Sequence, residues 1–337
     1  MRVLEISRLG LLKALLPDDT DWIRWGTSLT VDEPISPELF SLSLLARTLS
    51  QIGRREFDLI VLPAIHPQHV KDQSSYKVLS KAMLRGIARV PVLPSLLFRL
   101  GLRSARSVVL DIHDDRRLCD TSLRLFAGCN LYFKRELALD IDQAGPWAGK
   151  IRPLSLVLPD ENRIPAPRQK DIDLVFAGAL CSDARCKAIA EARALAAQGV
   201  RVLIPEKPLP YPAFMEILAR SWLVLSPEGQ GWDCYRHYEA CLAGSVPLIN
   251  RPRYRRHLYL QEGRHCFYYD ADRDGIAPRV LELLGDRQSL ARISAEGRRH
   301  VLANHTRSAV GRYILSELEA SSLARLPSGA DAPLWRG

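Results

Sequence analysis

One segment of the chain, residues 222–250, combines a short apolar strand, a glycine-rich turn, a helix and a second strand. Its first strand, Trp222–Leu225, contains no charged residue, which is typical of a parallel strand covered on both faces. Gly229 and Gly231 allow the turn to take backbone angles that other residues avoid, and Asp233 is placed to cap the helix. At Gly231 the alternative is a close approach that a side chain would prevent. This order of elements predicts a layered parallel α/β sheet.

The helix that follows the turn carries Arg236 and Glu239 on one face, because residues three apart are neighbours on a helix. A helix that opens at the carboxyl end of a strand presents unpaired N–H groups, which suit a diphosphate. The arginine can bind phosphate, and the carboxylate can accept hydrogen bonds from ribose hydroxyls. The competing interpretation is an intrahelical salt bridge on a solvated face. Gly178 and Lys207 follow two further apolar strands. The predicted nucleotide site consists of Gly178, Lys207, Glu228, Gly229, Gly231, Tyr235, Arg236 and Glu239.

The length of 337 residues favours two domains. Strands are expected in the first half at Arg2–Ile6, Trp22–Leu29, Phe57–Pro63, Ser107–Ile112 and Asn130–Lys134, with helices at 37–52 and 76–100. Ser36 and Pro37 form a helix-start signal. The second half repeats the alternation of strands and helices. A proline-containing stretch at 158–171 separates the halves. The sequence therefore predicts an α/β protein with a first domain at 1–160, a second at 171–305, a final amphipathic helix at 306–325 and a flexible tail at 326–337.

The net charge of +9 admits nucleic acid, an anionic membrane surface or an anionic small substrate as partner. No stacked aromatic repeat accompanies the basic residues, which argues against nucleic acid. The densest basic cluster, defined as Arg251, Arg253, Arg255, Arg256 and His257, is suited to lipid head groups or glycan phosphates. The alternative is a solvated loop without a partner.

Neither a GxGxxG nor a GxxxxGK[ST] motif occurs, which argues against a nicotinamide dehydrogenase and a P-loop NTPase. The seven cysteines lack the paired spacing of a zinc site, so reduced thiols are expected. The amino terminus enters a strand directly, and LGLLKALL is too short for a signal or membrane helix. A cytoplasmic location is expected from these features, with peripheral contact at the inner face of the membrane.

Four stretches of the second half resemble one enzyme family. They are DLVFAGAL at 173–180, WLVLSPEG at 222–229, the pair Arg236 and Glu239, and AGSVPLI at 243–249. The segment 171–305 is similar to exostosin and CgeB-type glycosyltransferases, which have the GT-B fold of two Rossmann-like domains facing a cleft. The resemblance implies that Glu239 holds the ribose of the donor and Arg236 its phosphates.

The same resemblance implies transfer of a sugar from a nucleotide sugar to a glycan or lipid-linked acceptor, without a metal or cofactor, in surface polysaccharide or glycoconjugate synthesis. Retaining GT-B enzymes often carry a second glutamate eight positions before the first, where this chain has Gly231. We therefore expect an inverting mechanism. The alternative is a non-catalytic nucleotide- or glycan-binding protein of the same fold.

Inversion requires a base that deprotonates the acceptor hydroxyl. The segment DIHDD at 111–115 follows an apolar strand, and His113 or Asp114 is the favoured base. Asp111 and Asp115 are alternatives, as are a metal site and a solvated loop. A similar strand exit places Lys134 and Arg135 where an anionic acceptor or a phosphate could bind; the alternative is an exposed basic strand end. The isolated histidines His66 and His69 are more typical of bystanders.

Overall fold

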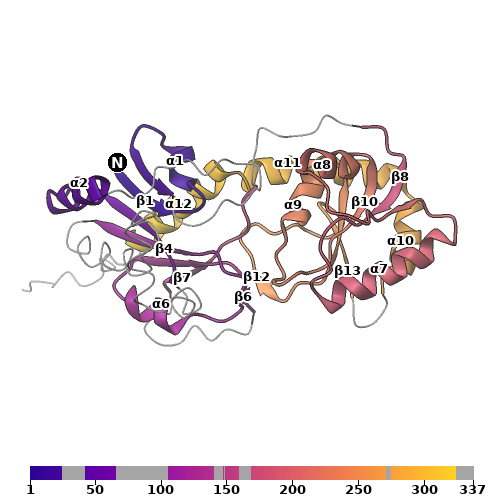
Figure 1. The fold of residues 1–337 in the computed structure, drawn as a ribbon, viewed down its shortest axis with the longest axis horizontal. Helices are drawn as coiled ribbons and strands as arrows, with labels where there is room; N and C mark the ends of the chain where they lie inside the picture. The colour runs from indigo at the N-terminus through magenta and orange to yellow at the C-terminus, as the bar shows by residue number, and fades with distance from the viewer. Residues whose placement is uncertain are drawn as a thin grey trace, which may run out of the picture.

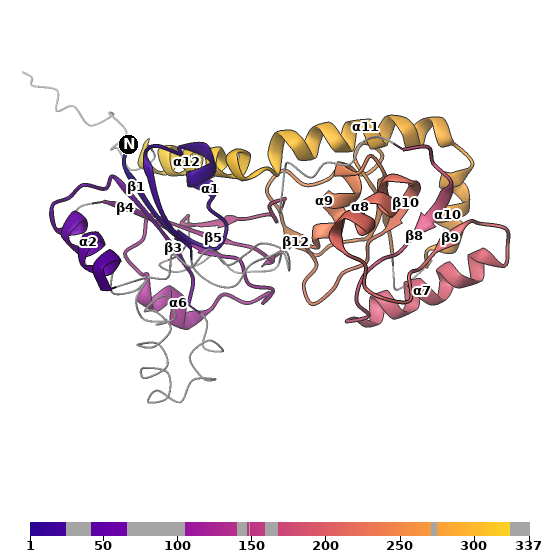
Figure 2. The same ribbon diagram turned by 45° about the horizontal axis from the view of Figure 1, so that its top comes forward.

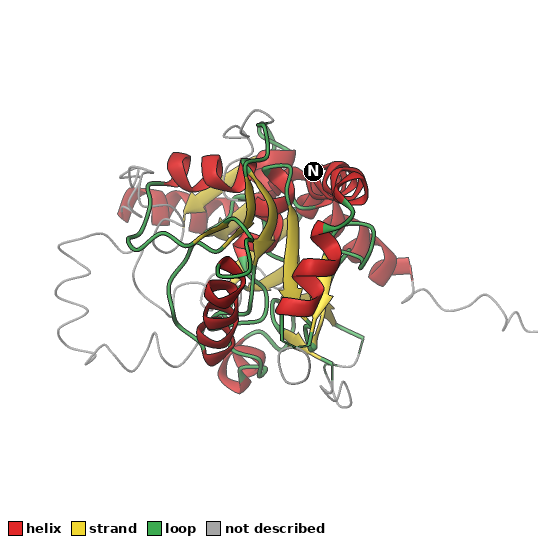
Figure 3. Cartoon of the chain, turned by 90° about the vertical axis from the view of Figure 1, so that its right-hand side faces the viewer, coloured by secondary structure: helices red, strands yellow, loops and turns green. Residues whose placement is uncertain are grey.

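The computed structural model describes residues 1–24, 42–65, 105–139, 147, 149–158, 168–270 and 275–323. Over these ranges the chain forms two separate α/β units, each built on one parallel sheet (Figure 1). Seen along the long axis, the strands lie between layers of helices (Figure 3). Each sheet has a hydrophobic core on both of its faces, which explains why its inner strands are mostly apolar.

The first sheet has the strand order β2-β1-β3-β4-β5-β7, and all of its pairings are parallel. Its strands are β1 Val3–Ser7, β2 Thr20–Arg24, β3 Leu59–Pro63, β4 Arg106–Asp111, β5 Leu131–Lys134 and β7 Ile151–Pro153. The helices packed on it are α1 Leu11–Leu15, α2 Leu42–Gly53, α6 Asp120–Leu125 and α12 Arg307–Leu323. We call this unit the first domain.

The second sheet has the order β13-β11-β10-β8-β9 and is also parallel. Its strands are β8 Ile172–Val175, β9 Val202–Leu203, β10 Ser221–Leu225, β11 Val246–Asn250 and β13 Phe267–Tyr269. The helices packed on it are α7 Asp183–Ala196, α8 Tyr211–Ala219, α9 Tyr235–Leu242, α10 Ala277–Leu284 and α11 Arg287–Asn304. We call this unit the second domain.

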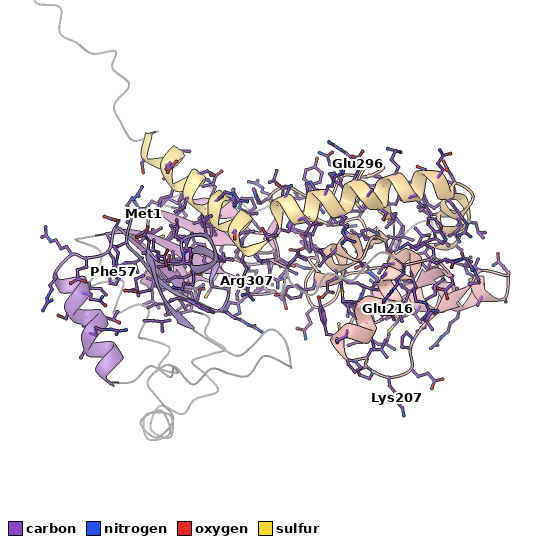
Figure 4. All side chains as sticks on the ribbon, turned by 90° about the horizontal axis from the view of Figure 1, so that it is seen from above. Met1, Phe57, Lys207, Glu216, Glu296 and Arg307 are labelled. Atoms are coloured by element: carbon purple, nitrogen blue, oxygen red, sulfur yellow. The ribbon has the colours of Figure 1, made fainter. Side chains whose placement is uncertain are left out.

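In the described part of the chain, two connections made by secondary-structure elements join the domains, in addition to side-chain contacts. Strand β6 (Leu137–Ala138) follows the first sheet and pairs antiparallel with β12 (Tyr254–Arg255) of the second domain. Helix α11 lies along the second domain and α12 returns to the first, so the two helices span the molecule (Figure 2). Arg307, at the start of α12, lies at the junction between the two domains (Figure 4). Val310 and Ile314 of α12 are fully buried in the core of the first domain.

The predicted strands of the first half match β1 to β5 to within a few residues at most ends. Helix α2 starts at Leu42 within the described residues. Three predictions lie outside the described residues: the helix start at Ser36 and Pro37, the helix at 76–100 and the end of the strand at Trp22–Leu29. The final helix was predicted, but its packing on the first sheet was not. The division of the chain at 160–171 stays a prediction.

Candidate functional site

A cavity of about 950 Å³ lies between the two domains, where the carboxyl ends of strands from both sheets meet. Loops that follow β1, β4 and β5 form one wall, and loops that follow β8, β9 and β10 form the other. In parallel α/β sheets, ligands bind beyond the carboxyl ends of the strands. Among its lining residues are the predicted site residues Asp114, Arg135, Gly178, Lys207, Gly229, Gly231, Tyr235, Arg236 and Glu239. His113, Lys134 and Glu228 are not part of this lining.

Arg236 extends from the first turn of α9 into the wall of the cavity. Its Nε donates to the carbonyl of Ala177 at 2.8 Å, and its guanidinium lies 4.7 Å from the ring of Phe176. Its Nη1 is buried and has no hydrogen-bond partner among the described residues. A Cβ on Gly178 would lie 1.8 Å from Nη2, so only glycine leaves room for this guanidinium. The unsatisfied Nη1 is a donor available to a ligand.

A second buried arginine, Arg185 on α7, lies beside Arg236 and was not predicted from the sequence. Its Nη1 donates to the carbonyl of Ala179 at 2.8 Å, and Nη1 and Nη2 contact the thiols of Cys181 and Cys234. Burial, and next the charge of Arg185, lower the pKa of Arg236 to about 10. The Arg236 guanidinium therefore stays charged at neutral pH, in a site that favours an anion.

Arg185 and Arg236 have no carboxylate within ion-pair distance in the described part of the chain. Glu239, three residues after Arg236, is buried as well, which excludes the predicted alternative of a salt bridge on a solvated face. Burial raises the pKa of Glu239 to about 7, against the lowering effects of Arg236 and of a hydrogen bond from Tyr211. The carboxyl thus titrates near neutrality inside the cavity.

The start of α9 differs from the prediction at Asp233. The capping position is Cys234, and no side chain caps the helix. The Asp233 carboxylate instead accepts hydrogen bonds from the hydroxyls of Tyr238 and Tyr254, at 2.8 and 2.9 Å, and from the N–H of Leu156 at 2.9 Å. Asp233 therefore fastens the turn to its surroundings, and no side chain competes with a ligand for the first N–H groups of α9.

The glycine turn, residues 226–234, contacts the first domain at Gly231. Neither Gly229 nor Gly231 has a positive φ, so the predicted need for unusual backbone angles is wrong. A Cβ on Gly231 would instead lie 2.5 Å from Oε1 of Glu136. Glu136 is wholly buried, and its carboxylate accepts from the N–H groups of Trp232 and Asp233 at 2.9 and 2.7 Å. Glycine is required here for close approach.

The predicted base segment lies opposite the glycine turn. Asp114 is exposed, lines the cavity and forms an ion pair with Arg135. Arg135 also donates to the carbonyls of Ile112 at 3.0 Å and Asp233 at 3.1 Å. Its groups are thus engaged in holding protein atoms, which weakens its assignment to an anionic acceptor. His113 is half-buried, and its backbone N–H donates to Asp111.

Lys134 is fully buried rather than placed at an exposed strand end. Its ammonium lies 3.6 Å from Oδ1 of Asp111, which is also fully buried, and it donates to the carbonyl of His113 at 3.2 Å. Asp111 Oδ2 accepts from the hydroxyl of Tyr132 at 2.8 Å. We therefore withdraw Lys134 as a phosphate or acceptor ligand and Asp111 as an alternative base. Both belong to a buried structural network that holds the end of β4 against β5.

Two further predicted residues, Lys207 and Glu228, differ from the two buried arginines in their placement. Lys207 is exposed and projects from a loop at the outer edge of the second domain (Figure 4), although it lines the cavity. Glu228 is bound through its main chain and side chain to Asn250, and its carboxylate lies 3.8 Å from Arg116. Glu228 therefore does not line the cavity, and His66 and His69 lie outside the described residues.

The basic cluster lies around β12 and is partly engaged within the protein. Arg251 forms an ion pair with Glu262, and Arg256 donates to the hydroxyl of Tyr268 at 2.9 Å. The interpretation of this cluster as a lipid or phosphate contact stays a prediction. Within the described ranges, no helix has the length and apolar character required to cross a bilayer, and no cluster of three or more potential metal ligands occurs. All seven cysteines, which are described, are free.

Comparison with known proteins gives one match at the level of sequence families. Residues 195–257, which contain β10, the glycine turn and α9, match the family described as RXYLT1 C-terminal domain. No curated protein matches the chain. The narrower resemblance to exostosin and CgeB-type enzymes stays a prediction.

Solved structures with the same architecture extend over nearly the whole chain. Sucrose-phosphate synthase from Thermosynechococcus elongatus is 10% identical, with 96% of this chain and 100% of that chain covered and a TM-score of 0.52. A glycosyltransferase from Rickettsia africae is 8% identical, with 95% and 98% covered and a TM-score of 0.51. Anabaena HepE in complex with UDP-glucose is 13% identical, with 95% and 100% covered and a TM-score of 0.50. The match covers only 51% of the S. aureus TarM G117R mutant. The chain has the predicted GT-B fold, with two Rossmann-like domains facing a cleft.

Proposed function

We propose that the protein is a glycosyltransferase that moves a sugar from a nucleotide sugar to an acceptor hydroxyl. The observation that carries this proposal is the pair of buried arginines, Arg185 and Arg236, beside the uncapped start of α9. Two buried positive charges that have no carboxylate within ion-pair distance among the described residues are costly unless an anion compensates them. A diphosphate would compensate both charges and accept from the unsatisfied Nη1 of Arg236.

In this proposal the protein assists departure of the nucleoside diphosphate. Negative charge develops on the leaving oxygen, and Arg185, Arg236 and the first N–H groups of α9 would stabilise it without a metal ion. Glu239 would accept hydrogen bonds from the ribose hydroxyls. Because its pKa is about 7, its ionised form, which accepts but does not donate, gains population above neutral pH.

For the acceptor side we propose that Asp114 or His113 is the general base of an inverting transfer. Asp114 belongs to the cavity wall formed by the first domain, across from the proposed donor site. The acceptor class, a glycan or lipid-linked glycan in surface polysaccharide or glycoconjugate synthesis in the cytoplasm, rests on the sequence resemblance. The alternative is a protein of the same fold that binds a nucleotide or glycan without turnover.

A panel of nucleotide sugars tests the proposal. UDP-sugars come first, because a GT-B protein of similar fold was solved with UDP-glucose. GDP-, dTDP-, ADP- and CMP-sugars complete the panel. A bound donor should raise the melting temperature by mass action, and release of the free nucleotide in the presence of candidate acceptors would separate the enzyme from the binding protein. A panel in which no nucleotide sugar changes the melting temperature would contradict the glycosyltransferase and the nucleotide-binding protein, and would leave only a glycan-binding protein.

A further inference from the structure

Two adjacent residues of the first domain, Arg135 and Glu136, form hydrogen bonds with the main chain of the glycine turn. We call these two residues the clasp. We propose that the clasp positions the start of α9, so that nucleotide affinity in the second domain depends on Glu136 of the first domain. Glu136 is a positioning residue in this account, because it does not line the cavity. The predicted effect on affinity rests on the proposed nucleotide site, whereas the hydrogen bonds between the clasp and the glycine turn do not depend on it.

The clasp binds main-chain groups of the turn in both directions. The carboxylate of Glu136 accepts from the N–H groups of Trp232 and Asp233, and Arg135 donates to the carbonyl of Asp233 at 3.1 Å. Arg135 Nη1 also lies 3.5 Å from Glu136 Oε1, so the two clasp residues orient each other. A charged acceptor makes stronger hydrogen bonds than a neutral one, and the two bonds to Asp233 are buried.

The backbone of the clasp is specialised for this contact. Glu136 has a φ of 58°, in the left-handed region that residues other than glycine rarely adopt. Such a conformation costs about 1–3 kcal/mol and persists only where the surroundings enforce it. Burial raises the pKa of Glu136 against the lowering effect of Arg135. A glutamate in this backbone conformation, removed from water, destabilises the folded state unless its contacts compensate. This favours a specific positioning role for Glu136.

The held segment leads directly into the proposed diphosphate site. Asp233 is the residue before Cys234, the capping position of α9, and Tyr235 and Arg236 follow at once. The Asp233 side chain is separately fixed by Leu156, Tyr238 and Tyr254. With its N–H, its carbonyl and its carboxylate all engaged, Asp233 sets the direction in which α9 begins. Loss of the clasp would free the N–H and carbonyl while leaving the carboxylate bound.

A thermodynamic consequence follows from this arrangement. If the clasp improves nucleotide binding, a bound nucleotide must strengthen the clasp by the same factor. The glycine turn then couples the donor site to the relative position of the two domains. Opening of the cleft at this edge would require Glu136 to leave two N–H groups unpaired, at a cost for each buried donor.

Two measurements on Glu136→Ala test the proposal. Hydrogen–deuterium exchange of peptides spanning residues 230–236 should become faster, because two N–H groups lose their acceptor. Affinity for UDP, or for the best nucleotide of the panel, should fall about 10- to 100-fold by calorimetry. Glu136→Gln keeps one acceptor oxygen and should recover part of both effects. The matched control is Glu191→Ala, which removes a carboxylate that accepts from the N–H of Ile276 at 2.6 Å near the start of α10.

The outcomes separate the two proposals. Exchange in residues 230–236 that is unchanged in Glu136→Ala would overturn the clasp, and faster exchange with unchanged affinity would reduce it to a domain contact. An equal loss of affinity in Glu191→Ala would also overturn it. If the wild type binds no nucleotide, the proposed function fails, and exchange alone decides whether the clasp holds the turn. If Glu136→Ala does not fold, Glu136→Gln carries both measurements.

Discussion

Gly231 and Glu136 meet across the domain boundary at a distance that leaves no room for a side chain on residue 231. Gly231→Val would displace the Glu136 carboxylate from the N–H groups of Trp232 and Asp233. We expect this variant to lose nucleotide binding while retaining most of its secondary structure, as measured by calorimetry and circular dichroism. Gly53→Val is the control, because a Cβ on Gly53 meets no atom of the described residues within 4 Å. Normal nucleotide binding by Gly231→Val would reduce the turn to a connector.

Glu239 should make both binding and stability depend on pH. Its pKa rises from an unfolded value of 4.5 to about 7 on burial, so the folded state holds the proton more tightly. The associated stability is therefore complete below pH 4.5 and is lost as the pH rises through 7, by at most about 3 kcal/mol. Glu239→Gln should remove this loss, and melting curves from pH 5 to 8 would detect it. Parallel pH profiles for the wild type and the variant would contradict the assignment.

The proposed contact between Glu239 and the ribose gives a second prediction for this residue. Glu239→Ala should weaken nucleotide binding by about 1–3 kcal/mol at pH 8, where the carboxylate is largely ionised, through lost charge-assisted hydrogen bonds. Calorimetry with a ribonucleotide and its 2′-deoxy analogue gives the direct comparison. The wild type should prefer the ribonucleotide more strongly than the variant does. An unchanged affinity would remove Glu239 from the site.

The general base should affect turnover without affecting donor affinity. One of His113→Ala and Asp114→Asn should lower turnover about 10²–10⁴-fold, because the base acts on the acceptor hydroxyl in the transition state. Asp120→Asn, which changes an exposed aspartate at the start of α6, is the comparison variant. Once an acceptor is identified, wild-type turnover in both variants across pH 6–9 would place the base elsewhere.

Lys134 should contribute to stability and not to binding. Lys134→Ala leaves Asp111 buried without its cation, and breaking a buried pair typically costs about 3–5 kcal/mol. The melting temperature should fall sharply, whereas exposed Lys207→Ala should leave it nearly unchanged. A Lys134→Ala protein that keeps its stability and loses nucleotide affinity would restore the anion-binding interpretation.

The sequence predicted the elements whose signal is local. Alternating apolar strands and helices gave both sheets, and the pair Arg236 and Glu239 lines the cavity as expected. Arg185 was missed because it lies in the first turn of α7 without any motif around it, and only folding brings it beside Arg236. Glu136 was missed for a similar reason, since its partners are the N–H groups of residues almost a hundred positions away. Lys134 was misjudged because a lysine at a strand end is usually exposed, and the sequence does not reveal its pairing with Asp111.

The central claim is that Arg185 and Arg236 bind the diphosphate of a nucleotide, and calorimetry with UDP and the other nucleoside diphosphates tests it most directly. The wild type should bind one of them, and the corresponding nucleoside without phosphates should bind far more weakly. Arg185→Ala and Arg236→Ala should each lower the affinity about 10- to 100-fold, by loss of charge-assisted hydrogen bonds. Arg299→Ala, which removes an exposed arginine on α11, should bind as the wild type does. Equal affinity in the wild type and in both buried-arginine variants, or no binding of any nucleoside diphosphate, would contradict the account.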